Sequence, residues 1–210
     1  MFKTIYLFIT IVLNSMLSFS QVINFGKCPQ VETMQYFDLE RFQGLWYEIE
    51  RFPPWGEIRG ECAHKRIQAC GRKVEIENDF VKYGIQFTFR VNSTYAPGDE
   101  AVFVIEKSYV DPSSIPISVI TTDYENYAVI YGCEYNEEWN LMFILGWVLS
   151  KTPTLSPELT EEARNQLISI PFANAAYLEK VHHGQKDCAH LWVAHIENAA
   201  IIDTDEADND

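Results

Sequence analysis

The chain has 210 residues, a length that fits one domain together with processing segments. Its formal net charge of −14 argues against nucleic acid as a partner, because the phosphates would be repelled rather than neutralised, and it disfavours adsorption to anionic lipid. The chain is 14% aromatic, so it carries many large apolar side chains for a core or a binding site.

The first 20 residues have the pattern of a secretory signal peptide. Lys3 supplies a positive start, residues 5–17 form an apolar run, and Ser18-Phe19-Ser20 places small residues at a cleavage site. The run is short for a membrane span, which needs roughly 20 apolar residues. We therefore expect residues 1–20 to be removed, and the mature protein to be secreted and extracellular with no transmembrane segment.

The body of the chain predicts a series of short β-strands separated by turn signals. In residues 85–91, the apolar Ile85, Phe87, Phe89 and Val91 alternate with polar residues, which is typical of a strand with one buried face. The expected strands are residues 46–52, 62–69, 73–80, 85–91, 101–107, 117–122, 128–135 and 139–150. Strands at this spacing indicate an all-β sandwich or barrel.

One amphipathic helix is expected after the strands. Ser156 is a good N-cap, Pro157 fits the first helical position, and Pro171 stops the helix. Four apolar residues fall on one stripe: Leu159, Ala163, Leu167 and Ile170. The chain then ends in an acidic segment, residues 196–210, which we expect to be a solvated, disordered tail.

Five cysteines in a secreted chain indicate disulfide bonds with one cysteine left over. The spacing by itself leaves the pairing open. The histidines, including His182, His183, His190 and His195, lack the spacing of a metal site, so we expect no bound metal.

Two short motifs identify a family resemblance. Gly44-Leu45-Trp46-Tyr47-Glu48 begins the first predicted strand, and Thr122-Asp123-Tyr124-Glu125-Asn126-Tyr127 lies between the sixth and seventh. Together with the cysteines and the leader, they resemble the lipocalins, most closely the apolipoprotein D and insect bilin-binding branch. The resemblance implies an eight-stranded antiparallel up-and-down β-barrel over residues 21–195, with one C-terminal α-helix packed outside and an apolar ligand inside.

The resemblance also implies two disulfides, Cys28–Cys133 and Cys62–Cys188, which leaves Cys70 unpaired. It gives structural roles to the motif residues Gly44, Trp46, Thr122, Asp123 and Tyr124. In relatives the motif tryptophan closes the floor of the barrel and stacks on an arginine. Here that arginine is replaced by Lys151, which keeps a cation–π contact possible but loses the planar guanidinium.

The expected ligand-binding residues are those predicted to face the barrel interior. Most of them match inward positions of relatives, whereas Phe87 and Phe89 are assigned from alternation alone. The set is Lys65, Ile67, Ile76, Asn78, Phe87, Phe89, Ile117, Val119, Leu145 and Trp147. An inward Lys65 either meets a carboxylate, from the ligand or from a neighbour such as Glu48, or lies near the mouth with its ammonium in water. We favour the second alternative.

Asn92-Ser93-Thr94 is an N-glycosylation acceptor, and it matches a glycosylated loop position in relatives. We expect Asn92 to be glycosylated.

The expected function is transport of a small hydrophobic ligand: a bilin, fatty acid, steroid or retinoid. No cofactor is required, although a bound bilin or lipid would suit the site. A partner-binding or cell-surface lipocalin, with a partner disulfide-linked through Cys70, is the alternative. A few lipocalins are isomerases with a nucleophilic cysteine inside the barrel, but the predicted turn at Cys70 and Gly71 argues against this, so we expect no enzyme.

Overall fold

The computed structural model describes residues 22–54, 56–71, 73–95, 101–106 and 115–196. The expected signal peptide lies outside the described residues, as does the acidic tail except for its first residue, Ile196. None of the described helices is long and apolar enough to cross a membrane.

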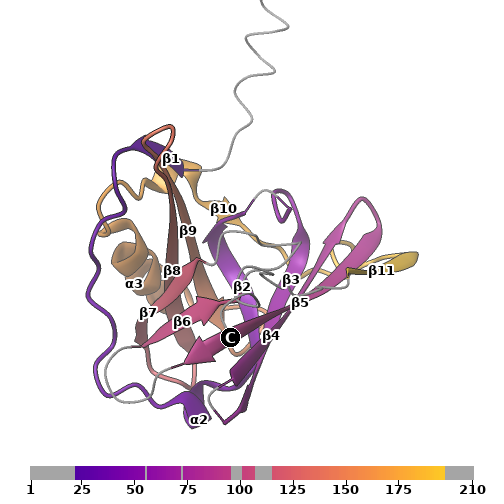
Figure 1. The fold of residues 1–210 in the computed structure, drawn as a ribbon. Helices are drawn as coiled ribbons and strands as arrows, with labels where there is room; N and C mark the ends of the chain where they lie inside the picture. Colours follow the sequence, from indigo (N-terminus) through magenta and orange to yellow (C-terminus); the bar gives the residue numbers. More distant parts are fainter. Residues whose placement is uncertain (1–21, 55, 72, 96–100, 107–114, 197–210) are drawn as a thin grey trace, which may run out of the picture.

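Eight consecutive antiparallel strands of the described chain form a closed barrel (Figure 1). They are β2 (Gly44–Phe52), β3 (Glu61–Cys70), β4 (Lys73–Lys82), β5 (Ile85–Tyr95), β6 (Val102–Ile105), β7 (Pro116–Thr122), β8 (Tyr127–Asn136) and β9 (Leu141–Ser150). Each strand pairs with the next, and β9 returns to β2, with Ser150 opposite Tyr47. The predicted fold is therefore confirmed.

Three further strands extend this sheet, and the sequence did not predict them. They are β1 (Val22–Phe25), which pairs with β9, β10 (Glu179–Lys180), which pairs with β2, and β11 (Trp192–Ile196), which pairs with β5 in parallel. The short β6 pairs only with the end of β5, at Ser93–Tyr95, so the first half of β5 has a free edge for β11. Ile196, where we expected the tail to begin, ends β11.

Two predictions of strand position are wrong in detail. The last barrel strand begins at Leu141 rather than at residue 139, because Trp139 lies in a turn where its N–H donates to the Asn136 side chain and Asn140 adopts a positive φ of 52°. Asn92 lies within β5 rather than in a loop, because β5 continues beyond residue 91 to Tyr95 along β4. The Asn92 side chain is nevertheless exposed.

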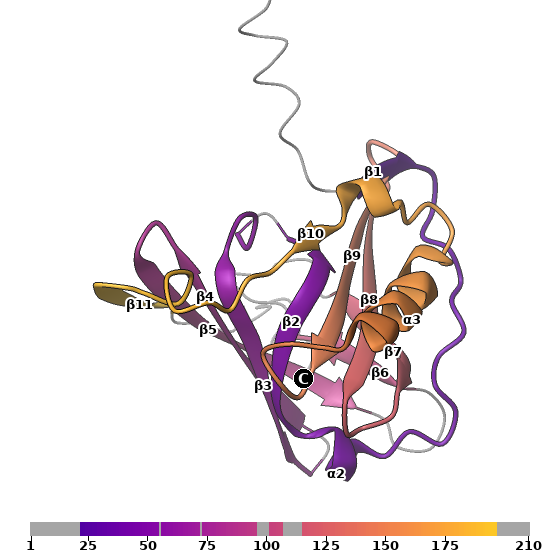
Figure 2. The same ribbon diagram turned by 180° about the vertical axis from the view of Figure 1, so that it is seen from behind.

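The single long helix of the described chain, α3 (Pro157–Ile168), packs on the outside of the barrel (Figure 2). The Ser156 side chain accepts a hydrogen bond from the Leu159 N–H at the start of the helix. Ala163 and Leu167 are fully buried against the wall. The helix ends before Ile170, which stays buried in the same cluster just beyond the C-cap.

Alternation along β9 separates the two sides of the wall. Met142, Ile144 and Val148 pack outward with the residues of α3, whereas Leu145, Trp147 and Leu149 belong to the cluster inside the barrel. Gly146 leaves room for the helix, since a Cβ there would lie 2.7 Å from Leu167 Cδ1. Residues of β9 that face the helix therefore lie on the outside of the barrel, and the residues between them lie inside.

Two smaller helical segments and two disulfides complete the described fold. The segments are α2 (Leu39–Phe42), at the closed end of the barrel, and the 3₁₀ turn η1 (Ala175–Tyr177). The bond Cys28–Cys133 attaches the N-terminal segment to β8, and Cys62–Cys188 attaches the C-terminal segment to β3. These are the pairs that the resemblance implies, and Cys70 is free and exposed at the end of β3.

Candidate ligand-binding site

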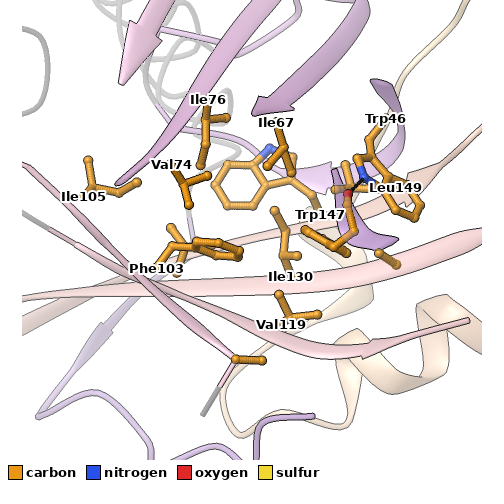
Figure 3. Packing of buried hydrophobic residues seen from close by; sticks show 14 of the residues in the cluster. Trp46, Ile67, Val74, Ile76, Phe103, Ile105, Val119, Ile130, Trp147 and Leu149 are labelled. Carbon is orange, nitrogen blue, oxygen red and sulfur yellow. Dashed lines mark hydrogen bonds between the residues drawn. The ribbon is translucent and has the colours of Figure 1, made fainter. Parts of the chain in front are cut away.

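The ten predicted binding residues all lie on the interior face of the barrel wall. Cross-strand register links them in two groups, one on β3–β5 and one on β7–β9. The first group pairs Lys65 with Asn78, Asn78 with Phe89, Ile67 with Ile76, and Phe87 with Phe80. The second joins Ile117 to Leu145 through Gly132, and Val119 to Trp147 through Ile130. Figure 3 shows several of these side chains converging from opposite walls.

The closed end of the interior is apolar and built around Trp46. Its side chain is fully buried, and its indole Nε1–H donates to the Phe42 carbonyl at 2.7 Å, which attaches α2 beneath the barrel. The Lys151 Nζ lies 3.9 Å from the centre of the Trp46 ring and donates to the Gln43 carbonyl at 2.8 Å. Gly44 has a φ of +101°, a conformation that other residues rarely adopt, so this motif position requires glycine.

The second motif forms the turn between β7 and β8 at the same end. The Asp123 side chain accepts hydrogen bonds from the backbone N–H groups of Glu125, Asn126 and Tyr127. Burial would raise the pKa of Asp123, but a hydrogen bond from the Asn126 side chain, together with these backbone bonds, holds it below its usual value. The adjacent Tyr124 hydroxyl accepts from the Asp38 N–H, which connects this turn to α2.

The prediction that Lys65 lies near the mouth with its ammonium in water is wrong. Lys65 does not reach water near the mouth, since it is only 5% exposed. Its Nζ lies 2.8 Å from Glu48 Oε1, donates to Asn78 Oδ1 at 2.8 Å, and stands 4.6 Å from the centre of the Trp147 ring. Lys65 lies opposite Trp46 on β2, where the wall surrounds it, and the Glu48 carboxylate offsets the cost of removing its charge from water.

Arg51 and Glu57 complete this buried group, which we call the charge cluster: Glu48, Arg51, Glu57 and Lys65. Arg51 is fully buried, and its guanidinium contacts Glu48 Oε2 at 2.6 Å. It also donates to the carbonyls of Glu57 and Gly60, both at 2.6 Å, and to Glu179 at 3.3 Å. Glu57, in the turn between β2 and β3, is 4% exposed.

The sequence did not predict Arg51 or Glu57. Simple alternation from Trp46 would place Glu48 and Glu50 on one face and Arg51 on the other. The register of β2 against β9 shifts between Glu48 and Glu50, so Arg51 joins Glu48 inside while Glu50 turns outward to Arg164 of α3. The sequence did offer one signal of a buried charged group: two carboxylates and one guanidinium occur within an otherwise largely apolar strand.

Electrostatics distinguish the members of the charge cluster. Burial would raise the pKa of Glu48, but Lys65 and Arg51 outweigh it and hold this pKa below its usual value. Burial would lower the pKa of Lys65, but Glu48 and Glu57 raise it instead. The pKa of Glu57 is raised by burial, and by its repulsion from Glu48, more than Lys65 and Arg51 lower it. Glu57 is therefore the carboxylate of this cluster that the site holds least well in its charged form.

The open end of the barrel carries aromatic side chains that solvent reaches. Phe87 and Phe89 share a face with Asn78 and Phe80, yet both are only partly buried. Phe80 and Phe87 stack with ring centres 5.3 Å apart. These rings are a part of the interior face that is exposed to solvent.

No metal site is found in the part of the chain that the structure describes, and the free cysteine in it lies outside the barrel interior. No group of three or more His, Cys, Asp or Glu side chains in it is arranged to hold a metal ion. The free thiol of Cys70 is exposed at the end of β3 and does not face the interior.

Residues 65–183 match the model of the lipocalin / cytosolic fatty-acid binding protein family. The chain belongs to this family. This lipocalin is 31% identical to insecticyanin-A of Manduca sexta over 149 residues, which cover 68% of the chain and 78% of the relative. It is 28% identical to the bilin-binding protein of Pieris brassicae over 162 residues, covering 76% and 85% of the two chains. It is 30% identical to apolipoprotein D of Bos taurus over 151 residues, covering 71% and 79%.

Solved structures agree with the lipocalin fold. The structure of insecticyanin from the tobacco hornworm superposes with a TM-score of 0.72 at 26% identity, covering 83% of this chain and 96% of that one. Lobster apocrustacyanin A1 superposes with a TM-score of 0.62 at 17% identity, covering 79% and 93%, which shows a shared fold.

Proposed function

We propose that this lipocalin is a secreted carrier that holds a small hydrophobic ligand inside its barrel and catalyses no reaction. The observation that carries the proposal is the convergence of apolar side chains from opposite walls toward an end with partly exposed aromatic rings. The interior lining is supplied by Ile67, Ile76, Ile117, Val119, Leu145 and Trp147, with Phe87 and Phe89 nearer solvent. An eight-stranded barrel of this kind is wide enough for one small ligand.

The ligand classes that suit this lining are bilins, fatty acids, steroids and retinoids. One relative supports a bilin as the first candidate, since it is named bilin-binding protein. Burying about 400 Å² of apolar ligand surface contributes roughly 10 kcal/mol before the costs of association. We therefore expect dissociation constants in the micromolar to nanomolar range.

Secretion and modification form part of the same proposal. The two disulfides are typical of an oxidising compartment, in agreement with the leader pattern of residues 1–20. Asn92 is exposed on the outer side of β5, where a glycan would not obstruct the interior, so we propose it as a glycosylation site.

A titration of tryptophan fluorescence tests the carrier function. The panel contains biliverdin, arachidonic acid, a steroid and retinol, and we expect saturable quenching by at least one of them. Trp147→Ala should weaken that binding because Trp147 lines the interior, whereas Trp139→Ala is the control, since Trp139 is 64% exposed in the β8–β9 turn. Absence of saturable quenching by every member would contradict the proposal.

A second candidate function rests on Cys70. Its thiol is free and exposed, so it is available for an intermolecular disulfide with a partner or a second copy. That function predicts a covalent dimer or adduct on a non-reducing gel that Cys70→Ser abolishes. A monomer with a titratable thiol would reject it.

A further inference from the structure

We infer that Glu57 is a displaceable internal carboxylate, and that the ligand's own carboxylate takes its place beside Lys65 and Arg51. The proposed ligand is therefore an apolar molecule with a carboxylate, and Glu57 determines this selectivity. The inference rests on the proposed carrier function, and it chooses among the ligand classes named above.

The charge cluster contains two cations that a carboxylate could contact. Lys65 of β3 and Arg51 of β2 both contact Glu48, at 2.8 and 2.6 Å. Trp147 adds an indole N–H on the same side, 3.4 Å from Glu57 Oε2. Together these three groups form a binding site for one carboxylate that Glu57 now occupies.

Glu57 is held in that site more loosely than Glu48. Its carboxylate oxygens lie 3.7 Å from Lys65 Nζ and 4.0 Å from the Arg51 guanidinium, beyond hydrogen-bonding distance. Glu48, in contrast, contacts both cations at hydrogen-bonding distance from within strand β2. Displacing the Glu57 carboxylate therefore breaks weaker contacts with the two cations than displacing the Glu48 carboxylate would.

The backbone around Glu57 is anchored independently of its side chain. Arg51 binds the carbonyls of Glu57 and Gly60, and the Gly60 N–H donates to the Glu57 carbonyl at 2.7 Å. The Glu57 carboxylate can therefore rotate toward the open end while the turn keeps its shape. Displacement requires a change of rotamer rather than unfolding of a strand.

The balance of charge favours exchange over simple addition. A further carboxylate would be the fourth acidic group next to two buried cations, after Glu48, Glu57 and Glu179, and a buried unpaired charge is costly. If Glu57 leaves as the ligand enters, the number of buried charges does not change. The ligand's apolar body then lies along Ile67, Ile76 and the other interior side chains toward the closed end.

Matched ligands that share one apolar chain and differ at the carboxyl group test this inference. The probes are oleic acid and methyl oleate, and their dissociation constants are measured for the wild type, Glu57→Gln and Glu57→Ala. We expect both variants to increase the preference for the acid over the ester by about tenfold, because the internal competitor is gone. The control is Glu61→Gln, which removes a carboxylate that faces His182 outside the barrel and should leave the preference within twofold.

A spectroscopic measurement complements the binding comparison, because it reads the charge of the bound carboxyl group in the wild type as well as in the variants. Carbon-13 NMR of oleic acid labelled at its carboxyl carbon should show a bound carboxyl group whose titration differs from that of the free acid and changes when Glu57 is replaced. An acid-to-ester preference unchanged in both Glu57 variants, or a bound carboxyl that titrates as in solvent, would overturn the inference while leaving the carrier function intact. Failure of every ligand, including those of the wider panel, to bind the wild type would overturn both proposals.

Discussion

Two regions of the barrel interior are built from opposite kinds of side chain. At the closed end, Trp46, Phe42 and Phe103 are almost completely buried, and the Phe42 and Phe103 rings stack with centres 6.1 Å apart. Toward the open end, the equally buried Arg51 and Glu48 belong to a cluster of charges. Burial is similar in the two regions, but the chemistry that accompanies it differs.

This difference separates stability from selectivity. Apolar burial at the closed end stabilises the fold directly, at roughly 25 cal/mol for each Å² removed from water. A buried ion-pair group contributes little net stability compared with apolar residues of the same size. The charge cluster therefore adds little to stability, which agrees with our proposal that it recognises a carboxylate on the ligand.

The largest expected effect comes from removing the apolar floor. Trp46→Ala should lower the free energy of unfolding by about 4 kcal/mol, because it leaves a large void and removes the hydrogen bond to α2. Urea denaturation followed by circular dichroism measures the loss. Trp139→Ala, at an exposed turn, should change stability by less than about 0.5 kcal/mol. Equal losses in the two variants would show that the floor is not the stabilising region.

Breaking the charge cluster on one side should cost about 3 kcal/mol. Lys65→Met leaves Glu48 buried with Arg51 as its remaining cation, and the added Glu48→Gln change should restore at least about 1 kcal/mol. The folded-state pKa of Glu48 lies below the usual 4.5, because the two cations outweigh its burial. Its stabilisation is thus present above pH 4.5 and lost as the pH falls through the lower value, so the wild type and Lys65→Met should converge in acid. A double variant no more stable than Lys65→Met would contradict this account.

A smaller effect is expected at the contact between Lys151 and Trp46. Lys151→Met should cost about 1 kcal/mol by removing a cation from the ring face and a donor from the Gln43 carbonyl. Lys151→Arg should be within about 0.5 kcal/mol of the wild type, because guanidinium can make both contacts. Thermal unfolding distinguishes the two variants, and an equal loss in both would refute a role for the charge.

The smallest effect concerns an ion pair outside the barrel. His64 Nε2 lies 3.3 Å from Asp79 Oδ2, and although burial opposes it, Asp79 raises the pKa of His64 above 6.5. The stabilisation is complete below pH 6.5 and lost as the pH rises through the higher folded-state value. His64→Gln should therefore cost roughly 0.5–1 kcal/mol at pH 5.5 and less at pH 9, measured by urea denaturation. His182→Gln, at an exposed pair with Glu61, is the control, and a pH-independent difference for His64→Gln would contradict the assignment.

Prediction from the sequence was strongest where periodicity carries the information. Alternation in residues 85–91 correctly identified β5, and the stripe of Leu159, Ala163 and Leu167 identified α3. The interior positions of Ile67, Leu145 and Trp147 followed from the same alternation together with the family motifs. These features depend on near neighbours along the chain, so a single strand or helix contains its own signal.

The sequence by itself determined the eight barrel strands and α3, and the resemblance it carries implied the two disulfide pairs. Only the tertiary structure decided that Lys65 is buried against Glu48, that a register shift in β2 brings Arg51 inside, and that Glu57 enters from a turn. It alone decided the parallel pairing of β11 with β5. The physical reason is that these features join residues from separate strands and turns, where the position of a charge depends on which walls surround it rather than on its neighbours in the chain.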